Sequence, residues 1–308
     1  MSTPRYLYET PCDKLSCRNK ARYTSGRCGV HDRSANRVEL PLRAQAALEA
    51  FERQDIPHAP GTVLMLRDRI PDASYHAVTI QALLGDGSSA YCYHVILDST
   101  HLALKAYRVG RRRSSVDREL HCWRKLQDSL YIPQVRGLAV DREDNHYVLS
   151  ELCAGGSLRT AWEQSPSSAQ RWLWWVEILR AVRDVHARGL VHLDLKLRNC
   201  VLTAEGGLKL IDFGACCPNG VVLKRSRGTR GYTAPELANV EKSCIVQASL
   251  DVYSLGVIAR LLRDGEREDR KYRKLPAVWA DCLELDPSQR PSADELVKRA
   301  ETLGMWDE

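Results

Sequence analysis

The segment HLDLKLRN, residues 192–199, places an acid, a base and an amide close together, at Asp194, Lys196 and Asn199. A second acid, Asp212, follows in IDFG, residues 211–214. Magnesium prefers hard oxygen ligands, usually one or two carboxylates together with phosphate oxygens. Phosphoryl transfer also needs a carboxylate that orients the attacking hydroxyl and a cation near the developing charge. These four side chains therefore form a set suited to phosphoryl transfer.

The elements that must hold these residues change in character along the chain. Stretches rich in β-branched and aromatic residues predict strands at 77–84, 91–97 and 101–108, of which the first two are joined by the turn GDGSSA. Helical spacing of apolar residues predicts helices at 116–127, 169–189, 249–262 and 292–303. A sheet-rich part followed by a helical part predicts two lobes with a cleft between them.

Together with other motifs, these segments resemble the eukaryotic-type protein kinase family. HLDLKLRN matches the family pattern H-R-D-L-x-x-x-N except at Leu193, and D-F-G is intact. APE at 234–236, DVYSLGV at 251–257 and DPSQRPS at 286–292 resemble further family motifs. The resemblance spans about residues 76–303. It implies an α+β, bilobal protein-kinase-like fold, with a small antiparallel sheet lobe that holds one helix and a larger helical lobe.

The resemblance also implies a binding site for ATP. LGDGSSAYC resembles the Gly-rich loop, whose glycines let the backbone approach the phosphates. Lys105 in LALK would contact the α- and β-phosphates, and Glu119 would pair with it, with Asp117 as the nearby alternative. The connector YVLSELCAGG would offer backbone groups to adenine. The expected nucleotide-binding residues are Leu84, Gly85, Asp86, Gly87, Ser88, Ser89, Ala90, Tyr91, Cys92, Lys105, Glu119, Glu151 and Cys153.

The same resemblance assigns roles to the remaining polar residues. Asp212 and Asn199 would hold Mg²⁺ or Mn²⁺, and Asp194 would accept or orient the proton of the substrate hydroxyl. Lys196 and Thr229, the latter in RGTRGYTAPE, resemble residues of serine/threonine kinases. The implied activity is transfer of the γ-phosphoryl group of ATP to Ser or Thr of protein substrates. The alternatives are a weak or inactive ATP-binding scaffold (a pseudokinase) and a kinase of a small molecule.

Leu193 departs from the family, which often has an arginine there that binds a phosphate on the activation segment. Leucine cannot form that pair, so we hypothesise that activity does not require it, although Ser226 could still be phosphorylated. The stretch at 263–279 is also shorter than the docking insertion of the family. Such a compact kinase resembles those of large DNA viruses, which would place it in an infected host cell.

The first residues of the chain follow a different pattern. Cys12, Cys17, Cys28 and His31 have the spacing C-x4-C-x10-C-x2-H, four ligands of the kind that zinc binds in a tetrahedron. The spacing predicts a structural Zn²⁺ site, with uncoordinated thiols or a disulfide as the alternatives. Residues 1–40 contain eight Lys or Arg and four Asp or Glu. A solvated basic surface is favoured there over nucleic-acid binding.

Composition sets the remaining expectations. The chain has 308 residues and a net charge of +6, with 44% hydrophobic and 27% charged residues, as in ordinary globular proteins. We find no signal peptide and no apolar run of about 18–20 residues, and the 11 cysteines suit a reducing compartment. We therefore expect a cytoplasmic or nuclear protein without membrane partners. The expected order is a Cys/His-rich segment (1–35), a helix and connector (36–75) and a kinase domain (76–303, divided near residue 152).

Overall fold

The computed structural model describes residues 58–68, 75–108, 111–238, 243–264 and 279–303. These residues belong to two compact units, and the described part of the first comprises only 58–63 and 79–82. Within that unit the Gly61 amide donates to the Ile80 carbonyl at 2.8 Å, and the Ile80 amide donates to the Thr62 carbonyl at 2.8 Å. The candidate zinc ligands and the helix expected before residue 58 lie outside the described residues.

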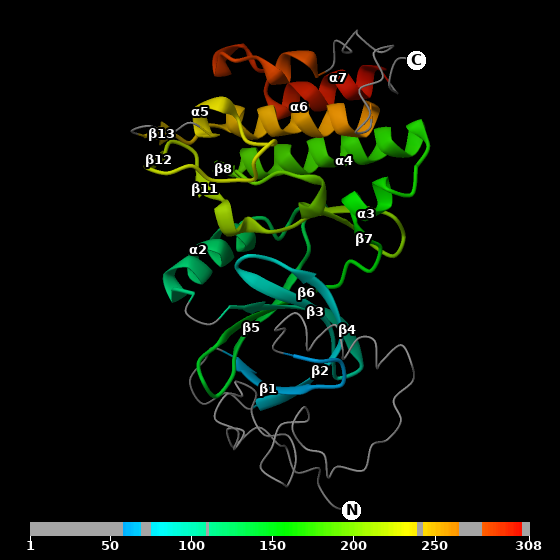
Figure 1. Ribbon diagram of the computed structural model, residues 1–308, viewed down its shortest axis with the longest axis vertical. Coiled ribbons are helices and arrows are strands. Elements are labelled where there is room, and N and C mark those ends of the chain that lie inside the picture. The colour runs from blue at the N-terminus through cyan, green and yellow to red at the C-terminus, as the bar shows by residue number, and fades with distance from the viewer. Residues whose placement is uncertain (1–57, 69–74, 109–110, 239–242, 265–278, 304–308) are drawn as a thin grey trace, which may run out of the picture. The chain divides into compact units, whose positions relative to one another are not determined.

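The second unit contains an antiparallel sheet (Figure 1). Its strands neighbour one another in the order β3-β4-β6-β5-β1. Alternate residues of β3 and β4 are buried, among them Tyr93, Val95 and Leu104, because successive side chains of a strand point to opposite faces. The strand bounds are β1 (Val63–Asp68), β2 (Tyr75–Asp86), β3 (Ala90–Leu97), β4 (Thr100–Tyr107), β5 (Val135–Val140) and β6 (His146–Glu151).

Three of these strands, β2, β3 and β4, lie where the sequence pattern predicts them, whereas β1 does not. β1 falls within 36–75, where the pattern indicates only a helix and a connector. It pairs with β5 through Arg67 opposite Val140 and Asp68 opposite Ala139. Leu64 and Leu66 are buried, but an alternation this short, next to Pro57 and Pro60, is too weak a signal to identify a strand.

The helices of the second unit are α2 (Arg113–Arg124), α3 (Leu158–Trp162), α4 (Ser168–Ala187), α5 (Pro235–Ala238), α6 (Ala248–Asp264) and α7 (Ala293–Leu303). The four longest match the helices that the apolar spacing predicts. Ser167 caps α4 by accepting a hydrogen bond from the Gln170 amide at 3.1 Å. Buried α4 residues such as Trp175 and Ile178 pack in one core with α6 and α7, and Figure 1 shows these three helices side by side.

Short strands and single helical turns occupy the middle of the chain. They form three small antiparallel sheets with the orders β10-β9-β7, β11-β8 and β12-β13. The segment with Asp194 runs from β8 to β9, and Asp212 comes two residues after β10, so these strands fix both acids. The bounds are β7 (Gly156–Ser157), β8 (Leu190–Val191), β9 (Cys200–Leu202), β10 (Leu208–Leu210), β11 (Cys217–Pro218), β12 (Val222–Leu223) and β13 (Cys244–Ile245).

In the described part of the chain, every helix is too short or too polar to span a membrane.

Candidate active site

Three side chains surround the carboxylate of Asp194. Thr229 Oγ1 donates a hydrogen bond to Asp194 Oδ1 at 2.6 Å. Lys196 Nζ and Asn199 Nδ2 donate to Asp194 Oδ2 at 2.8 and 3.1 Å. Lys196 Nζ also donates to Thr229 Oγ1 at 2.9 Å. These four predicted site residues, from two separate segments, therefore form one hydrogen-bonded cluster.

A second cluster is centred on Lys105 of β4. Its ammonium group is ion-paired with Glu119 of α2 and donates a hydrogen bond to Asp212 Oδ1 at 3.0 Å. The side chain of Lys105 is 12% exposed and that of Glu119 is 1% exposed, so this pair is shielded from water. An amine and two acids thus converge from the sheet, from α2 and from the segment after β10.

The charges in this cluster stabilise one another. Burial alone lowers the pKa of Lys105, but the carboxylates of Glu119 and Asp212 outweigh it and hold that pKa well above its usual value. Burial alone raises the pKa of Asp212, but the neighbouring Lys105 ammonium outweighs it and lowers that pKa to about 2. At neutral pH the lysine is therefore a cation and the aspartate an anion, which are the states that bind phosphate and metal.

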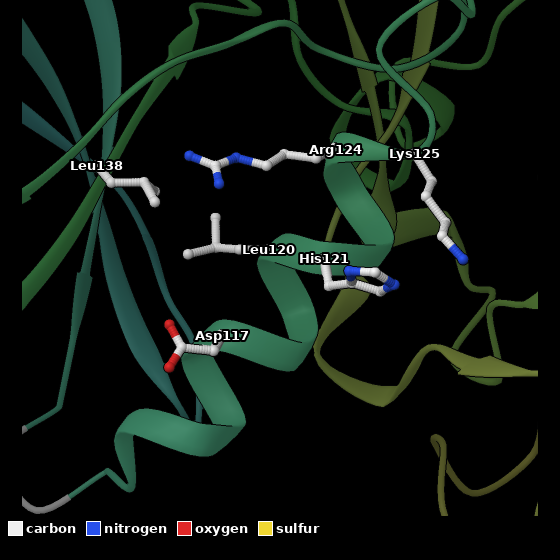
Figure 2. Close-up of a pocket in the computed structure, with 6 residues that line it drawn as sticks. All are labelled: Asp117, Leu120, His121, Arg124, Lys125 and Leu138. Atoms are coloured by element: carbon white, nitrogen blue, oxygen red, sulfur yellow. The ribbon is translucent and has the colours of Figure 1, made fainter. Parts of the chain in front are cut away.

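Helix α2 shows which acid pairs with Lys105. Asp117 and Glu119 are two residues apart, so they point about 200° away from each other around the helix. Asp117 is exposed and lines a pocket between α2 and β5 with Leu120 and Leu138, as Figure 2 shows. The sequence leaves Asp117 open as an alternative, and the geometry places Glu119 at the lysine instead.

Backbone contacts hold the two clusters together. The Asn199 carbonyl accepts a hydrogen bond from the Ile211 amide at 2.9 Å, and His192 Nε2 lies 3.1 Å from the Ile211 carbonyl. The next residue, Asp212, has a φ of 67°, which is rare for an aspartate and is typical of strained functional segments. Phe213 follows and is buried with its ring centroid 5.3 Å from that of His192.

Asp251, at the beginning of α6, fixes the backbone just before Asp194. Its buried carboxylate accepts hydrogen bonds from the amides of His192 and Leu193 at 2.7 and 2.8 Å, and it lies 3.0 Å from His186 Nε2. Burial alone raises the pKa of Asp251, but the hydrogen bond and charge of His186 outweigh it and lower that pKa. The sequence marks DVYSLGV as a family motif without giving this aspartate a role, because the contact forms only when α6 meets the loop.

The predicted Gly-rich loop, Leu84–Cys92, spans the end of β2, a turn and the beginning of β3. The Gly87 amide donates to the Ala90 carbonyl at 3.0 Å and closes the turn around Ser88 and Ser89. Cys92 lies opposite Lys105 in the β3–β4 register. The loop therefore joins β2 to β3, the strand that pairs with the lysine-bearing β4.

Arg108, directly after β4, holds this loop through four contacts that the sequence does not predict. Its guanidinium is ion-paired with Asp86 and hydrogen-bonded to the Tyr91 hydroxyl. Arg108 Nε donates to the Gly87 carbonyl at 3.1 Å, and the guanidinium carbon lies 4.0 Å from the centre of the Tyr91 ring. The alternating pattern of β3 and β4 does not predict these contacts of Arg108, because they depend on how the strand ends align.

The connector after β6 contains the two residues expected to contact adenine. The Glu151 amide donates to the Gln134 carbonyl at 2.8 Å, and the Glu151 carbonyl accepts a hydrogen bond from Ser150 Oγ at 3.5 Å. The Glu151 side chain does not face a base, because it is ion-paired with Lys209 at 3.1 Å. Cys153 is half-buried two residues further along.

The segment from Phe213 to Glu236 is attached to the rest of the site by apolar packing and by polar contacts. Leu193 is buried in the same apolar cluster as Leu223 and Leu237. At the end of the segment, Glu236 receives two hydrogen bonds from Arg290, at 2.6 and 3.0 Å. The APE and DPSQRPS motifs therefore meet in one ion pair.

The donor set around Asp212 fits a magnesium ion. Asn199 uses its amide nitrogen for Asp194, so the oxygen is the atom that it can offer to a cation. One Glu119 oxygen is buried without a hydrogen-bond partner, which marks a polar environment that ligand or water can complete. Carboxylate and amide oxygens are the ligands that Mg²⁺ takes. Within the described residues there is no cluster of three or more Cys, His, Asp or Glu side chains that could hold zinc.

Comparison with known proteins agrees with this geometry. Residues 78–270 match the family model described as protein kinase domain. The hormonally up-regulated neu tumor-associated kinase of Homo sapiens is 30% identical over 276 residues, which cover 75% of this chain and 38% of that protein. Serine/threonine-protein kinase KIC1 of Saccharomyces cerevisiae is 28% identical over 211 residues, 59% of this chain and 19% of that protein. A probable serine/threonine-protein kinase of Zea mays, CCRP1, is 28% identical over 251 residues, 70% of this chain and 40% of that protein.

The chain therefore belongs to the eukaryotic-type protein kinase family, whose members use ATP and Mg²⁺ to phosphorylate proteins. It spans only 19–40% of the length of these three relatives.

Proposed function

We propose that this kinase is active and transfers the γ-phosphoryl group of ATP to Ser or Thr hydroxyl groups of proteins. The observation that carries the proposal is the convergence of Lys105, Glu119 and Asp212 beside the hydrogen-bonded cluster at Asp194. A scaffold that had lost catalysis would not need all of these groups held together. Serine/threonine kinases among the relatives also support the proposal.

Each group has a separate task in the proposed reaction. Bound Mg·ATP supplies the transferable phosphoryl group and the metal charge that neutralises the phosphates. Lys105, held by Glu119, binds the α- and β-phosphates. Asp212 and the Asn199 oxygen hold the metal. The Gly-rich loop Leu84–Cys92 covers the phosphates, and the backbone of Glu151 and Cys153 contacts adenine.

Asp194 orients the acceptor. Its carboxylate would take the proton of the substrate hydroxyl as the oxygen bonds to the γ-phosphorus, and the bond from that phosphorus to the bridging oxygen would break to release ADP. Lys196, which bridges Asp194 and Thr229, supplies positive charge where the transferred group becomes more negative. Thr229 fixes one carboxylate oxygen, and Lys196 and Asn199 donate hydrogen bonds to the other. This arrangement supports a Ser or Thr acceptor, because the lysine and threonine resemble those of serine/threonine kinases.

The test is a transfer assay with labelled ATP and Mg²⁺ on peptides that are identical except for a single Ser, Thr or Tyr. We expect label on the Ser and Thr peptides, no label above background on the Tyr peptide, and a loss of at least about 100-fold in the Asp194→Asn variant. A Mg·ATP titration of the same variant shows whether it still folds and binds nucleotide. Transfer by the unaltered protein no faster than by Asp194→Asn would favour the inactive scaffold.

A further inference from the structure

Two exposed arginines flank Asp194 from different segments of the chain. Arg198 lies in the helical turn Leu197–Asn199, directly before Asn199, whose amide is 3.1 Å from the Asp194 carboxylate. Arg230 directly follows Thr229, whose hydroxyl is 2.6 Å from the same carboxylate. Consecutive Cα atoms are about 3.8 Å apart, so each arginine begins one residue from a group that touches Asp194.

Neither arginine is used by the fold. In the part of the chain that the structure describes, no hydrogen bond or ion pair involves the side chain of Arg198 or Arg230. By contrast, Lys196 is bound to Asp194 and Arg227 donates to the Ala215 carbonyl at 3.2 Å. Single exposed arginines are usually just solvated. Here, however, two from separate segments each directly adjoin, in the chain, a residue that is hydrogen-bonded to Asp194.

The surrounding charge has the same sign. From 213 to 235 the sequence contains Lys224, Arg225, Arg227 and Arg230 and no acidic residue. Lys224 and Arg225 are exposed. Of the two acids that border this stretch, Glu236 is in a two-point pair with Arg290, and Asp212 is paired with Lys105. The rim along this segment is therefore cationic, and like charges on a substrate would be repelled.

We propose that the acceptor site of this kinase selects Ser or Thr residues flanked by anionic side chains, with Arg198 and Arg230 as the residues that determine specificity. The anionic side chains are Asp or Glu carboxylates or a phosphoserine placed beside the acceptor. Arg198 and Arg230 bind these anionic groups near Asp194. Lys224 and Arg225 extend the region of positive electrostatic potential along the segment. This inference rests on the proposed function and names its substrate class.

The experiment compares four peptides of equal length with one central Ser. Their flanks contain aspartates, glutamines, lysines or one phosphoserine. We expect kcat/KM to rank the aspartate and phosphoserine peptides above the glutamine peptide and the lysine peptide last. The ratio of the two anionic peptides distinguishes carboxylate from phosphate recognition. A kcat/KM for the lysine peptide equal to or above that for the aspartate peptide would overturn the inference and leave the proposed function intact.

Charge-reversal variants test the two residues directly. Arg198→Glu and Arg230→Glu should each lower kcat/KM for the aspartate peptide relative to the glutamine peptide by about 5–30-fold, mainly through KM, and should improve the lysine peptide. Arg260→Glu is the matched control, because Arg260 is exposed and lies nine residues, or about 13.5 Å, along α6 from Asp251. A loss in Arg260→Glu as large as in the other two would mean that only net charge matters and would overturn the assignment.

Binding measured without catalysis separates this inference from the proposed function. The fluorescence anisotropy of labelled peptides should show tighter binding of the aspartate peptide than of the lysine peptide at low ionic strength. The difference should shrink when the Debye length falls from roughly 30 Å at 0.01 M salt to about 8 Å at 0.15 M. Equal affinities at low salt would contradict the inference. If the protein binds the aspartate peptide selectively but transfers no phosphate, the proposed function fails while the inference of a cationic surface that binds anionic peptides stands.

Discussion

Leu193 and Leu223 are packed in one buried apolar cluster, 4% and 6% exposed, although 30 residues separate them in the chain. The first precedes Asp194 and the second lies in the segment that carries Thr229. Leu193 also has a φ of 67° and an amide bound to Asp251 at 2.8 Å, so its conformation is fixed. Apolar packing thus joins the two segments at the point where related kinases often use an arginine and a phosphate.

The first prediction follows from this packing. Because the leucine needs no phosphate partner, phosphatase treatment and Ser226→Ala should each change the rate of phosphate transfer by less than about two-fold. The measurement is the initial rate on the Ser peptide, with mass spectrometry to show the phosphorylation state of each sample. A large loss of rate in both samples would contradict the account.

Gly228 provides a second test of how Thr229 is positioned. Its φ is +90°, and a Cβ there would lie 2.6 Å from the Leu193 carbonyl oxygen. Gly231 has a φ of +89° and no atom within 4 Å of the same position. Both Gly→Ala variants have a backbone cost of about 1 kcal/mol, but only Gly228→Ala must also move the chain away from the Leu193 carbonyl, next to both Thr229 and Asp194.

We therefore expect Gly228→Ala to lower kcat by at least about ten-fold and Gly231→Ala to leave it nearly unchanged. Steady-state kinetics and thermal unfolding of both variants check this. Equal kcat values for the two variants would show that the close approach at Gly228 does not position the catalytic cluster.

Arg108 leads to a third prediction, about nucleotide binding. Arg108→Ala removes the contacts to Asp86, Gly87 and Tyr91, so the Gly-rich loop loses its support. The KM for ATP should rise by about five-fold or more while kcat changes less, because the groups that transfer phosphate are untouched. Arg108→Lys should raise the KM for ATP less than Arg108→Ala does, but still above that of the unaltered protein, since lysine cannot form the planar contacts of a guanidinium. Exposed Arg136→Ala serves as the control, and an unchanged KM in Arg108→Ala would contradict the prediction.

Asp251 gives a prediction about stability. Asp251→Ala leaves two buried amides without acceptors and His186 without its partner, so the free energy of unfolding should fall by about 3–5 kcal/mol. Urea unfolding measures this, and Asp117→Ala, at an exposed position, should change it by less than about 0.5 kcal/mol. A similar small change in Asp251→Ala would mean that its carboxylate does not hold the loop.

The pH dependence of the same residue has a defined sign. The folded pKa of Asp251 lies below its usual value. The stability that its ionised form contributes is therefore complete above the unfolded pKa of about 3.9 and is lost as the pH falls further. The free energy of unfolding, measured with urea at several pH values between 6 and about 3, should therefore fall less in Asp251→Ala than in the unaltered protein.

The sequence predicts the elements that have a long, regular pattern. The apolar spacing of α4 and α6 and the alternation in β3 and β4 each extend over enough residues to identify the element. The order of the polar motifs also predicts which side chains gather at Lys105 and at Asp194. These signals are local in the chain or tied to motifs, so no tertiary contact is needed to recognise them.

Other features form only through tertiary contacts. The contacts of Arg108 depend on the β3–β4 register. Asp251 gains its role when the beginning of α6 meets the amides of His192 and Leu193. The strand β1 is too short to stand out from the connector around it. The absence of an arginine at 193 is plain in the sequence, whereas the apolar cluster that contains Leu193 is visible only in the fold.

The most direct test of the central claim is a crystal structure of the protein with Mg²⁺ and a non-hydrolysable ATP analogue. The account predicts Lys105 Nζ within hydrogen-bonding distance of an α- or β-phosphate oxygen, still paired with Glu119. It also predicts the metal between Asp212 and the phosphates, with Asp194 facing the acceptor side. A nucleotide bound elsewhere, or Lys105 and Asp212 turned away from the triphosphate, would contradict the account.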